Sequence, residues 1–127
     1  MNLSDIMQWL ALQVDCPQFY VGKVGSAPES ITIYNTVGTA PRIAIGGLDN
    51  TSYTNKPISL LVHWGKSPSV AERKAREVYD AMFGKRAVIG GKRVIMFNMR
   101  TTEPIGVGTD SEGFYEYVIE VNILHER

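Results

Sequence analysis

Two segments of the chain place apolar residues at the spacing of a helix. In the first, Ile6, Met7, Leu10 and Val14 form one stripe. Ser4 stands where a helix cap is expected, and Pro17 ends the helix because the residue before a proline disfavours helical dihedrals. We therefore expect an amphipathic helix near the N-terminus.

The second helical segment reads KSPSVAERKAREVYDAMFG and carries the clearest end signals in the chain. Ser67-Pro68 places a cap residue directly before a first-turn proline. Its apolar stripe is made of alanines, a valine and a methionine, and Gly84 is a natural C-terminal stop. The pattern predicts a helix over about residues 68–83, with its small alanines lying close on a sheet.

The other apolar segments alternate with a period of two, which is typical of strands. The predicted strands are Phe19–Val24, Ser30–Val37, Arg42–Ile45, Pro57–Trp64, Arg86–Ile89, Lys92–Thr101 and Phe114–Leu124. Gly90-Gly91 is a two-residue hairpin signal. Two long loops are expected at Gly46–Lys56 and Thr102–Gly113, either mobile or ordered by a neighbouring subunit. The order of elements predicts an α+β fold whose mainly antiparallel mixed sheet carries both helices on one face.

Size and composition restrict the class of protein. The 127 residues make one domain, with 44% hydrophobic and 20% charged residues, as in soluble globular proteins. Cys16 is the single cysteine, which excludes an internal disulfide and fits a reducing compartment. The N-terminus has no basic start of a signal peptide, and no apolar run approaches the length of a membrane span. We expect a cytoplasmic protein without a membrane partner.

Motifs for catalysis or cofactor binding are incomplete. Cys16, His63 and His125 lack the close spacing of a zinc site, and we expect His125 to lie in a terminal tail. Gly90-Gly91-Lys92 lacks the first glycine and the Ser/Thr of a phosphate-binding loop, and Gly106-x-Gly108 lacks its third glycine. The sequence predicts a protein that is not an enzyme, with no catalytic residue, cofactor or metal.

Charge is distributed unevenly along the chain. The segment from Lys66 to Arg100 contains nine basic and three acidic residues, so its net charge is +6. Because the whole chain is neutral, the remainder carries −6. This basic stripe (residues 66–100) fits a solvated surface, a contact with the acidic part of another copy, or a nucleic-acid contact. Head-to-tail contacts between copies can close into a ring.

The order of the elements and the residues in several of them resemble those of a known family. The resemblance is carried by Phe19-Tyr20-Val21, Ile31-Thr32-Ile33-Tyr34, Leu60-Leu61-Val62-His63-Trp64-Gly65, the Ser/Pro-capped helix and Tyr115-Glu116-Tyr117-Val118-Ile119. Nearly the whole chain, as one domain over residues 1–127, is similar to the small minor-capsid and tail-terminator proteins of long-tailed phages and prophages.

The resemblance implies a homohexameric ring at the head-proximal end of the tail tube. Such a ring ends tube polymerisation and contacts the tail tube protein on one side and the head-completion protein on the other. DNA would pass through its lumen without being read. The virion, in its tail or neck, is then the expected location, after assembly in the host cytoplasm.

The uneven charge predicts which residues meet between subunits. Arg73, Arg76 and Lys85 of one copy are expected against acidic residues of the next, namely Glu112, Glu116 and Glu120. Two alternatives stay open: a head-completion or stopper protein of the connector, and, in a different class, a small nucleic-acid-binding domain that uses the basic stripe.

Overall fold

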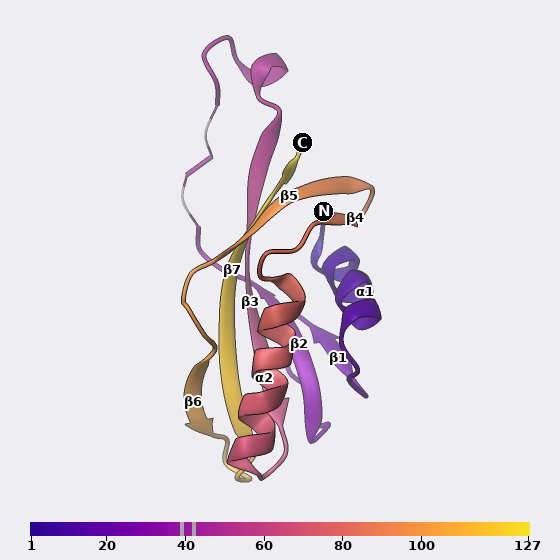
Figure 1. The fold of residues 1–127 in the computed structure, drawn as a ribbon, viewed down its shortest axis with the longest axis vertical. Coiled ribbons are helices and arrows are strands. Elements are labelled where there is room, and N and C mark those ends of the chain that lie inside the picture. The colour runs from indigo at the N-terminus through magenta and orange to yellow at the C-terminus, as the bar shows by residue number, and fades with distance from the viewer. Residues whose placement is uncertain (39, 42) are drawn as a thin grey trace.

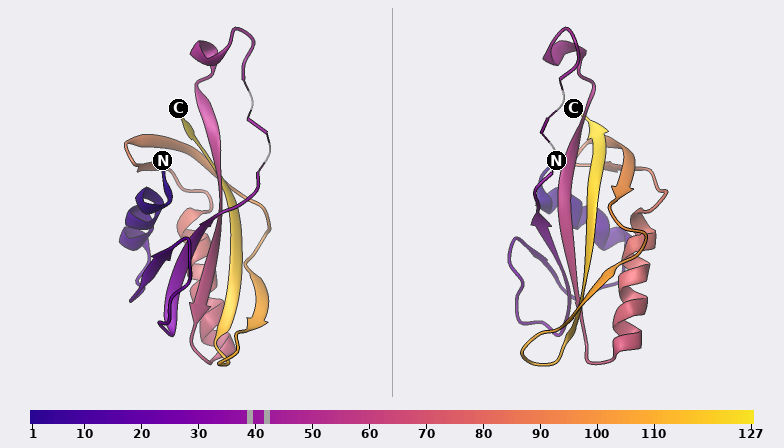
Figure 2. Two further views of the ribbon diagram at one scale, coloured as in Figure 1. Left: turned by 180° about the vertical axis from the view of Figure 1, so that it is seen from behind. Right: turned by 90° about the vertical axis from the view of Figure 1, so that its left-hand side faces the viewer.

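A seven-stranded mixed sheet carries both helices on one of its faces in the computed structural model of the chain (Figures 1 and 2). Residues 1–38, 40–41 and 43–127 are described. The helical elements are α1 (Leu3–Gln13), the 3-10 turn η1 (Leu48–Asn50) and α2 (Pro68–Met82). The strands are β1 (Phe19–Val21), β2 (Glu29–Asn35), β3 (Tyr53–Trp64), β4 (Ala87–Ile89), β5 (Lys92–Met99), β6 (Ile105–Thr109) and β7 (Tyr115–Glu126). This confirms the predicted α+β class.

The strand order is β1-β2-β3-β7-β5-β4, and β6 pairs with β7 beyond the end of β5. Every pairing is antiparallel except that of β1 with β2. The two longest strands, β3 and β7, pair from Tyr53↔Glu126 to His63↔Glu116 and form the centre of the sheet. Their buried positions alternate along each strand, so one face of the sheet is apolar and packs under the helices.

The first helix is capped differently from the sequence prediction. Asn2, not Ser4, is the N-cap: the Asp5 backbone N–H donates to Asn2 Oδ1, and the Asn2 backbone N–H donates to Asp5 Oδ2, each at 2.9 Å. This capping box satisfies two backbone donors, which a cap at Ser4 followed by Met7 could not do. Ile6 and Leu10 of the predicted stripe are buried against the sheet.

Helix α2 is confirmed almost to the residue. Ser67 is its N-cap with Pro68 in the first turn, although the Ser67 side chain makes no capping hydrogen bond. Ala71 and Ala75 are completely buried, and their small side chains let the helix lie close on β3 and β7. Tyr79, outside the predicted stripe, is also buried and donates from its hydroxyl to Thr101 O at 2.7 Å.

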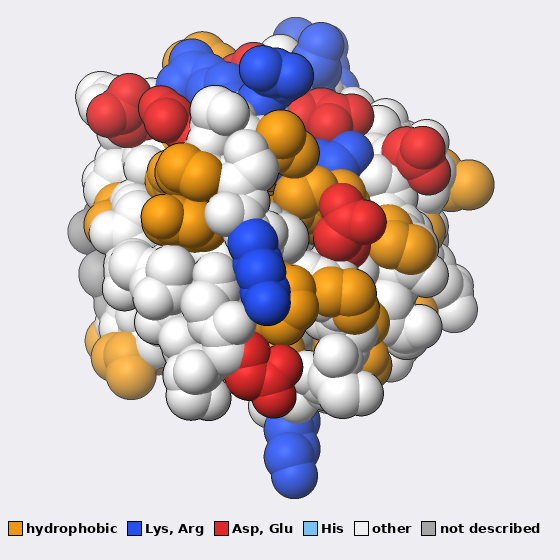
Figure 3. Space-filling model, turned by 90° about the horizontal axis from the view of Figure 1, so that it is seen from below, with side chains coloured by type: hydrophobic (Ala, Val, Ile, Leu, Met, Phe, Trp, Pro, Cys, Tyr) orange, Lys and Arg blue, Asp and Glu red, His pale blue; other side chains and the backbone are white. Residues whose placement is uncertain are grey.

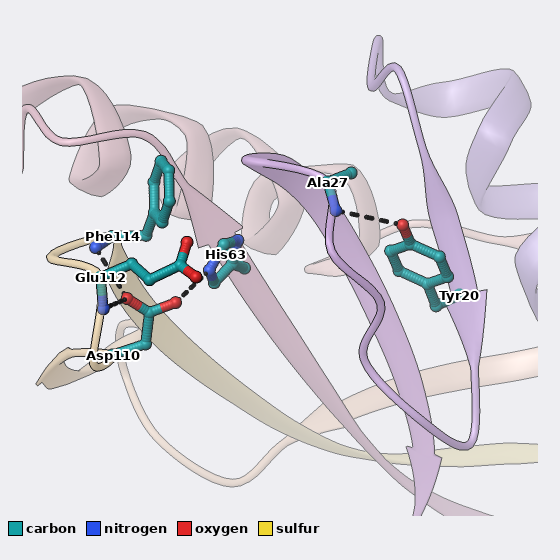
Figure 4. Close-up of polar contacts among 6 residues, drawn as sticks. All are labelled: Tyr20, Ala27, His63, Asp110, Glu112 and Phe114. Carbon is teal, nitrogen blue, oxygen red and sulfur yellow. Dashed lines mark hydrogen bonds and ion pairs between the residues drawn. The ribbon is translucent and has the colours of Figure 1, made fainter.

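The core lies between the helices and one face of the sheet. Its fully buried large side chains include Ile6, Leu10, Ile31, Ile33, Ile58, Leu60, Met82, Ile89, Ile119 and Ile123. We call the opposite face of the sheet the far face. The connection between β1 and β2 lies on this side, where Tyr20 Oη accepts a hydrogen bond from the Ala27 backbone N–H at 3.2 Å (Figures 2 and 4).

Three predictions about strands and loops are wrong in part. In the predicted strand Arg42–Ile45, Arg42 lies outside the described residues and residues 43–45 form no strand. The predicted loop Gly46–Lys56 ends early, because β3 begins at Tyr53, where it pairs with the last residues of β7. These first residues of β3 are polar and show no alternation in the sequence, so the long partner strand decides their conformation.

The predicted loop Thr102–Gly113 contains strand β6, which pairs with the first half of β7. Glycine is normally disfavoured in strands, but here it is required for packing. A Cβ atom at Gly106 would lie 3.2 Å from Tyr117 Cε1, so only glycine fits against the Tyr117 ring without a shift.

The predictions for the remaining hairpin and for His125 have opposite outcomes. Gly90 and Gly91 have φ of 58° and 76°, which confirms the two-residue turn between β4 and β5. His125 does not lie in a tail: it is buried in β7 opposite Val94, and its Nδ1 lies 2.7 Å from Glu126 O. The final strand is longer than predicted because β3 and β5 flank it on both sides to its end.

Candidate assembly surfaces

The predicted basic contact residues lie on the helix side of the sheet. Arg73 and Arg76 are on the exposed side of α2, and Lys85 is exposed just after the helix ends. Arg76 Nε is 3.3 Å from Asp80 Oδ1, and its guanidinium lies over the Tyr79 ring, 5.0 Å from the centroid. Because Arg76 and Asp80 are both half exposed, solvent screens this ion pair, and the arginine stays accessible to a partner.

The predicted acidic contact residues lie elsewhere. Glu116 and Glu120 alternate with the buried Ile119 and Val121 in β7, so they are on the far face. Glu120 Oε2 accepts from Arg100 Nη1 at 3.2 Å, within the same chain. Glu112 is exposed in the turn between β6 and β7, at the end of the molecule where α2 begins (Figure 1).

The structure therefore separates the two predicted sets instead of bringing them together. The arginines are on the helix side, while Glu116 and Glu120 are on the far face, and no ion pair joins the two sets among the described residues. Figure 3 looks at the end that holds the β6–β7 turn, where Lys and Arg side chains gather along one edge; hydrophobic side chains, a few Asp and Glu side chains and further Lys and Arg side chains are spread over the rest. The two predicted sets thus lie on different sides of one copy.

A groove of about 500 Å³ runs between α2 and β6. The ring of Tyr117 and Pro104 are among its apolar lining, and Glu72, Arg73 and Arg76 are among its charged lining. Burial raises the pKa of the Tyr117 phenol, and the nearby Glu72 carboxylate adds to the rise. All five residues of β6 beside the groove are exposed. The groove thus places the predicted arginines next to the edge strand β6. Exposed edge strands can pair with strands of other chains.

A histidine–aspartate pair holds the β6–β7 turn on the far face. The ring of His63 is buried, and its Nε2 lies 2.8 Å from Asp110 Oδ2 (Figure 4). Asp110 Oδ1 accepts from the backbone N–H groups of Glu112 at 2.9 Å and Phe114 at 3.0 Å. The His63 hydrogen bond and then the Phe114 hydrogen bond hold the pKa of the Asp110 carboxyl below its ordinary value.

Sequence reasoning missed this pair because its members are 47 positions apart. The sequence does carry a signal for Asp110: an aspartate followed by a glycine three residues later is typical of a turn in which the carboxylate accepts backbone hydrogen bonds. Nothing in the pattern could name His63 as the second partner, since the pairing depends on how β6 returns along β7.

Cys16 is half-buried, and its thiol is hydrogen-bonded to the backbone. Cys16 Sγ donates to Gln18 O at 3.1 Å, and burial raises the pKa of the thiol, although Lys74 acts in the opposite direction. A raised pKa keeps the sulfur in its less nucleophilic form at neutral pH.

Among the described residues, no group of three or more His, Cys, Asp and Glu side chains could hold a metal ion. Neither described helix is long and apolar enough to cross a membrane.

Four of the nine residues in the basic stripe pair with carboxylates of the same chain: Lys74, Arg76, Arg93 and Arg100. Lys74 also donates to Asp15 O at 2.6 Å and lies over the Trp64 ring, 4.8 Å from its centroid. Its charge therefore ties α2 to the segment after α1. Lys74 is therefore used inside the chain, while the side chains of Arg76 and Arg93 stay exposed, at 50% and 71%, and leave positive surface available.

Comparison with known proteins gives the family. A family described as bacteriophage tail terminator protein matches the chain over residues 4–127. Neither the curated proteins nor the solved structures yield a match. The matched region includes all of α1 except its first residue, all of α2, every strand of the sheet and both sets of charged residues described above. The chain therefore belongs to the bacteriophage tail terminator family, a family of structural proteins.

Proposed function

We propose that the protein forms a homohexameric ring at the head-proximal end of the tail tube. The ring ends tube polymerisation and joins the tail to the head. The match to the tail terminator family over residues 4–127 carries this proposal. The neck of the virion is then its final location, reached by assembly in the cytoplasm of the bacterial host.

The positions of the charged residues support a head-to-tail contact between copies. Arg73 and Arg76 lie on the helix side, and Glu116 lies on the far face. A surface that meets a different surface of the next copy makes a heterologous contact, which closes into a ring when the rotation between copies allows it. Lys85 on the basic side, and Glu112 and Glu120 on the acidic side, complete the proposed contact.

The two ends of such a ring have different partners. We propose the tail tube protein on one end and the head-completion protein on the other, with DNA passing through the lumen without sequence recognition. No cofactor takes part. The function is steric and interfacial, so it depends on surface complementarity rather than on a reactive group.

Electron microscopy of lysates from a phage or prophage that lacks this gene tests the proposal. We expect overlong or unattached tail tubes beside full heads without tails. Tails of normal length that fail only to join heads would contradict the terminator role and indicate a head-completion protein. Ordinary infectious particles would contradict both structural roles. Complementation with the intact gene is the control.

The proposed contact residues can be tested with two complementary charge reversals. One variant carries Arg73→Glu and Arg76→Glu, and the other carries Glu112→Lys and Glu116→Lys. We expect neither variant to assemble alone, because its two contact faces then carry like charges. An equimolar mixture should assemble, because the reversed face of one variant attracts the reversed face of the other. Lys23→Glu, an exposed basic residue outside the set, is the control. Assembly by either variant alone would contradict the assignment.

A further inference from the structure

An arm projects from the end of the sheet opposite the β6–β7 turn (Figures 1 and 2). Its described residues are 36–38, 40–41 and 43–52, between β2 and β3, and they include η1. Four large apolar side chains on this arm are exposed: Val37, Ile43, Ile45 and Leu48. Ile45 is fully exposed, at 103%. Single apolar residues are ordinary on a surface, but several on one projection mark a contact surface.

Hydrogen bonds hold the tip of the arm in shape. Arg127 Nη1 donates to Leu48 O at 2.6 Å and to Thr51 O at 3.2 Å. Thr51 Oγ1 accepts from the Ala44 backbone N–H at 3.0 Å and donates to Gly47 O at 3.1 Å. Ile45 and Leu48 are thus presented from an ordered turn, which lowers the entropy lost when they dock.

The same chain carries a matching cavity of about 370 Å³ between the C-terminal half of α2 and β5. Apolar side chains and two arginines are among its lining: Tyr79, Phe83, Met96, Met99, Arg76 and Arg100. Phe83 and Met96 are themselves exposed, at 59% and 50%. This cavity is open to solvent, and its volume is large enough for two branched aliphatic side chains, because about 150 Å³ already holds a benzene ring.

Charge also favours the match. Asp49, next to Leu48 on the arm, is exposed and forms no ion pair with the described residues. Arg76 and Arg100 line the cavity; within the chain Arg76 pairs with Asp80, and Arg100 pairs with Glu120 and donates to Val37 O at the base of its own arm at 2.9 Å. A docked arm brings the Asp49 carboxylate toward these two guanidinium groups. An apolar projection and an apolar cavity at separate places on one chain make a heterologous contact that continues from copy to copy.

We infer that the arm of one copy docks into the α2–β5 cavity of the next copy, with Ile45 and Leu48 against Phe83 and Met96. The inference rests on the proposed function in one respect: it names the contact between subunits that would close the ring. It adds an apolar contact to the charged faces proposed above. The arm would then change from a solvent-exposed projection to a buried connection when copies assemble.

Cysteine cross-linking between copies tests this inference. In a Cys16→Ser background, one protein carries Ile45→Cys and a second carries Phe83→Cys. A disulfide requires Cα atoms within about 4.4–6.8 Å, so it reports direct contact. We expect a cross-linked dimer when the two proteins are mixed under oxidising conditions, and only background dimer from each alone. Leu48→Cys with Met96→Cys is a second pair that should also cross-link.

In the control, the cysteine is placed at an exposed apolar position outside the arm. Leu12→Cys, on the exposed side of α1, should give no dimer above background when mixed with Phe83→Cys. The cross-links are measured on the purified protein and on virions assembled with the variants. Absence of both pairs from both preparations would contradict the inference. A third protein carries both Ile45→Cys and Phe83→Cys. A disulfide that forms only within single copies of this protein would contradict the inference, because the arm would then lie on its own cavity.

The outcome can be separated from that of the proposed function. Overlong tails in the deletion lysate without these cross-links would contradict the arm contact alone. Cross-links between copies beside ordinary infectious particles from the deletion would contradict the tail terminator role and leave the arm contact in place.

Discussion

At the scale of single residues, the contact between His63 and Asp110 makes stability depend on pH. Its hydrogen bonds lower the pKa of Asp110 below the ordinary value of 3.8 in the folded protein. The unfolded chain therefore binds a proton at a higher pH than the folded one does. The stabilisation is complete above about pH 5, one unit above the unfolded value, and is lost as pH falls through the lowered pKa.

Asp110→Asn should remove this part of the pH dependence. We expect the urea midpoint of the variant to fall less than that of the unmodified protein between pH 6 and acid conditions, and to be lower at pH 6 itself. Denaturation followed by circular dichroism measures both. Glu103→Gln, an exposed carboxylate outside the turn, should keep the original profile. Equal acid sensitivity in Asp110→Asn and the unmodified protein would show that the pair does not contribute.

The hydroxyl of Tyr79 gives a second prediction at this scale. Tyr79 is a buried residue of α2, and its hydroxyl donates to Thr101 O at 2.7 Å. Tyr79→Phe keeps the ring and leaves this carbonyl without its donor, so we expect a loss of about 1 kcal/mol in the free energy of unfolding. Tyr53→Phe, at a half-exposed ring, should change it by less than about 0.5 kcal/mol. Equal effects would contradict the role of the bond.

At the scale of elements, two leucines of α1 should contribute very differently to the free energy of unfolding. Leu10 is completely buried against the sheet, while Leu12, two positions later, is 83% exposed. Leu10→Ala should lower the free energy of unfolding by about 2–5 kcal/mol, because it removes buried methyl groups and leaves a cavity. Leu12→Ala should stay within about 0.5 kcal/mol. Similar losses in the two variants would place α1 differently from the structure.

At the scale of the whole molecule, salt should separate the two kinds of contact proposed between copies. The Debye length falls from about 8 Å at physiological ionic strength to about 3 Å at 1 M salt, so contacts between exposed charged faces weaken. Apolar docking of the arm does not weaken in this way, and sulfate strengthens it. Light scattering at constant protein concentration measures the oligomer.

We expect the assembled fraction to fall with sodium chloride and to recover in ammonium sulfate. Ile45→Asp should prevent the recovery in sulfate, because it places a charge where the arm must enter an apolar cavity. An assembled fraction that is unaffected by sodium chloride would contradict the charged contact, and recovery in Ile45→Asp would contradict the apolar one.

The sequence by itself determined those parts of the fold that local patterns encode. The period of α2, its Ser67-Pro68 start and the hairpin glycines Gly90-Gly91 each depend on neighbours along the chain. Alternation placed Ile119 and Val121 on one side of the last strand for the same reason. The uneven charge, and with it the choice of Arg73 and Glu116 as contact residues, was also readable from the chain alone, although the contact itself stays a prediction.

Only the tertiary structure decided what depends on distant partners. The first residues of β3, and β6 with its glycines, become strands because β7 pairs with them along both edges, and not because of their own propensity. The pairing of His63 with Asp110 and the separation of the charged sets onto two sides follow from strand order. The exposure of Ile45 likewise follows from where the arm leaves the sheet, since an apolar residue in a sequence does not say what will cover it.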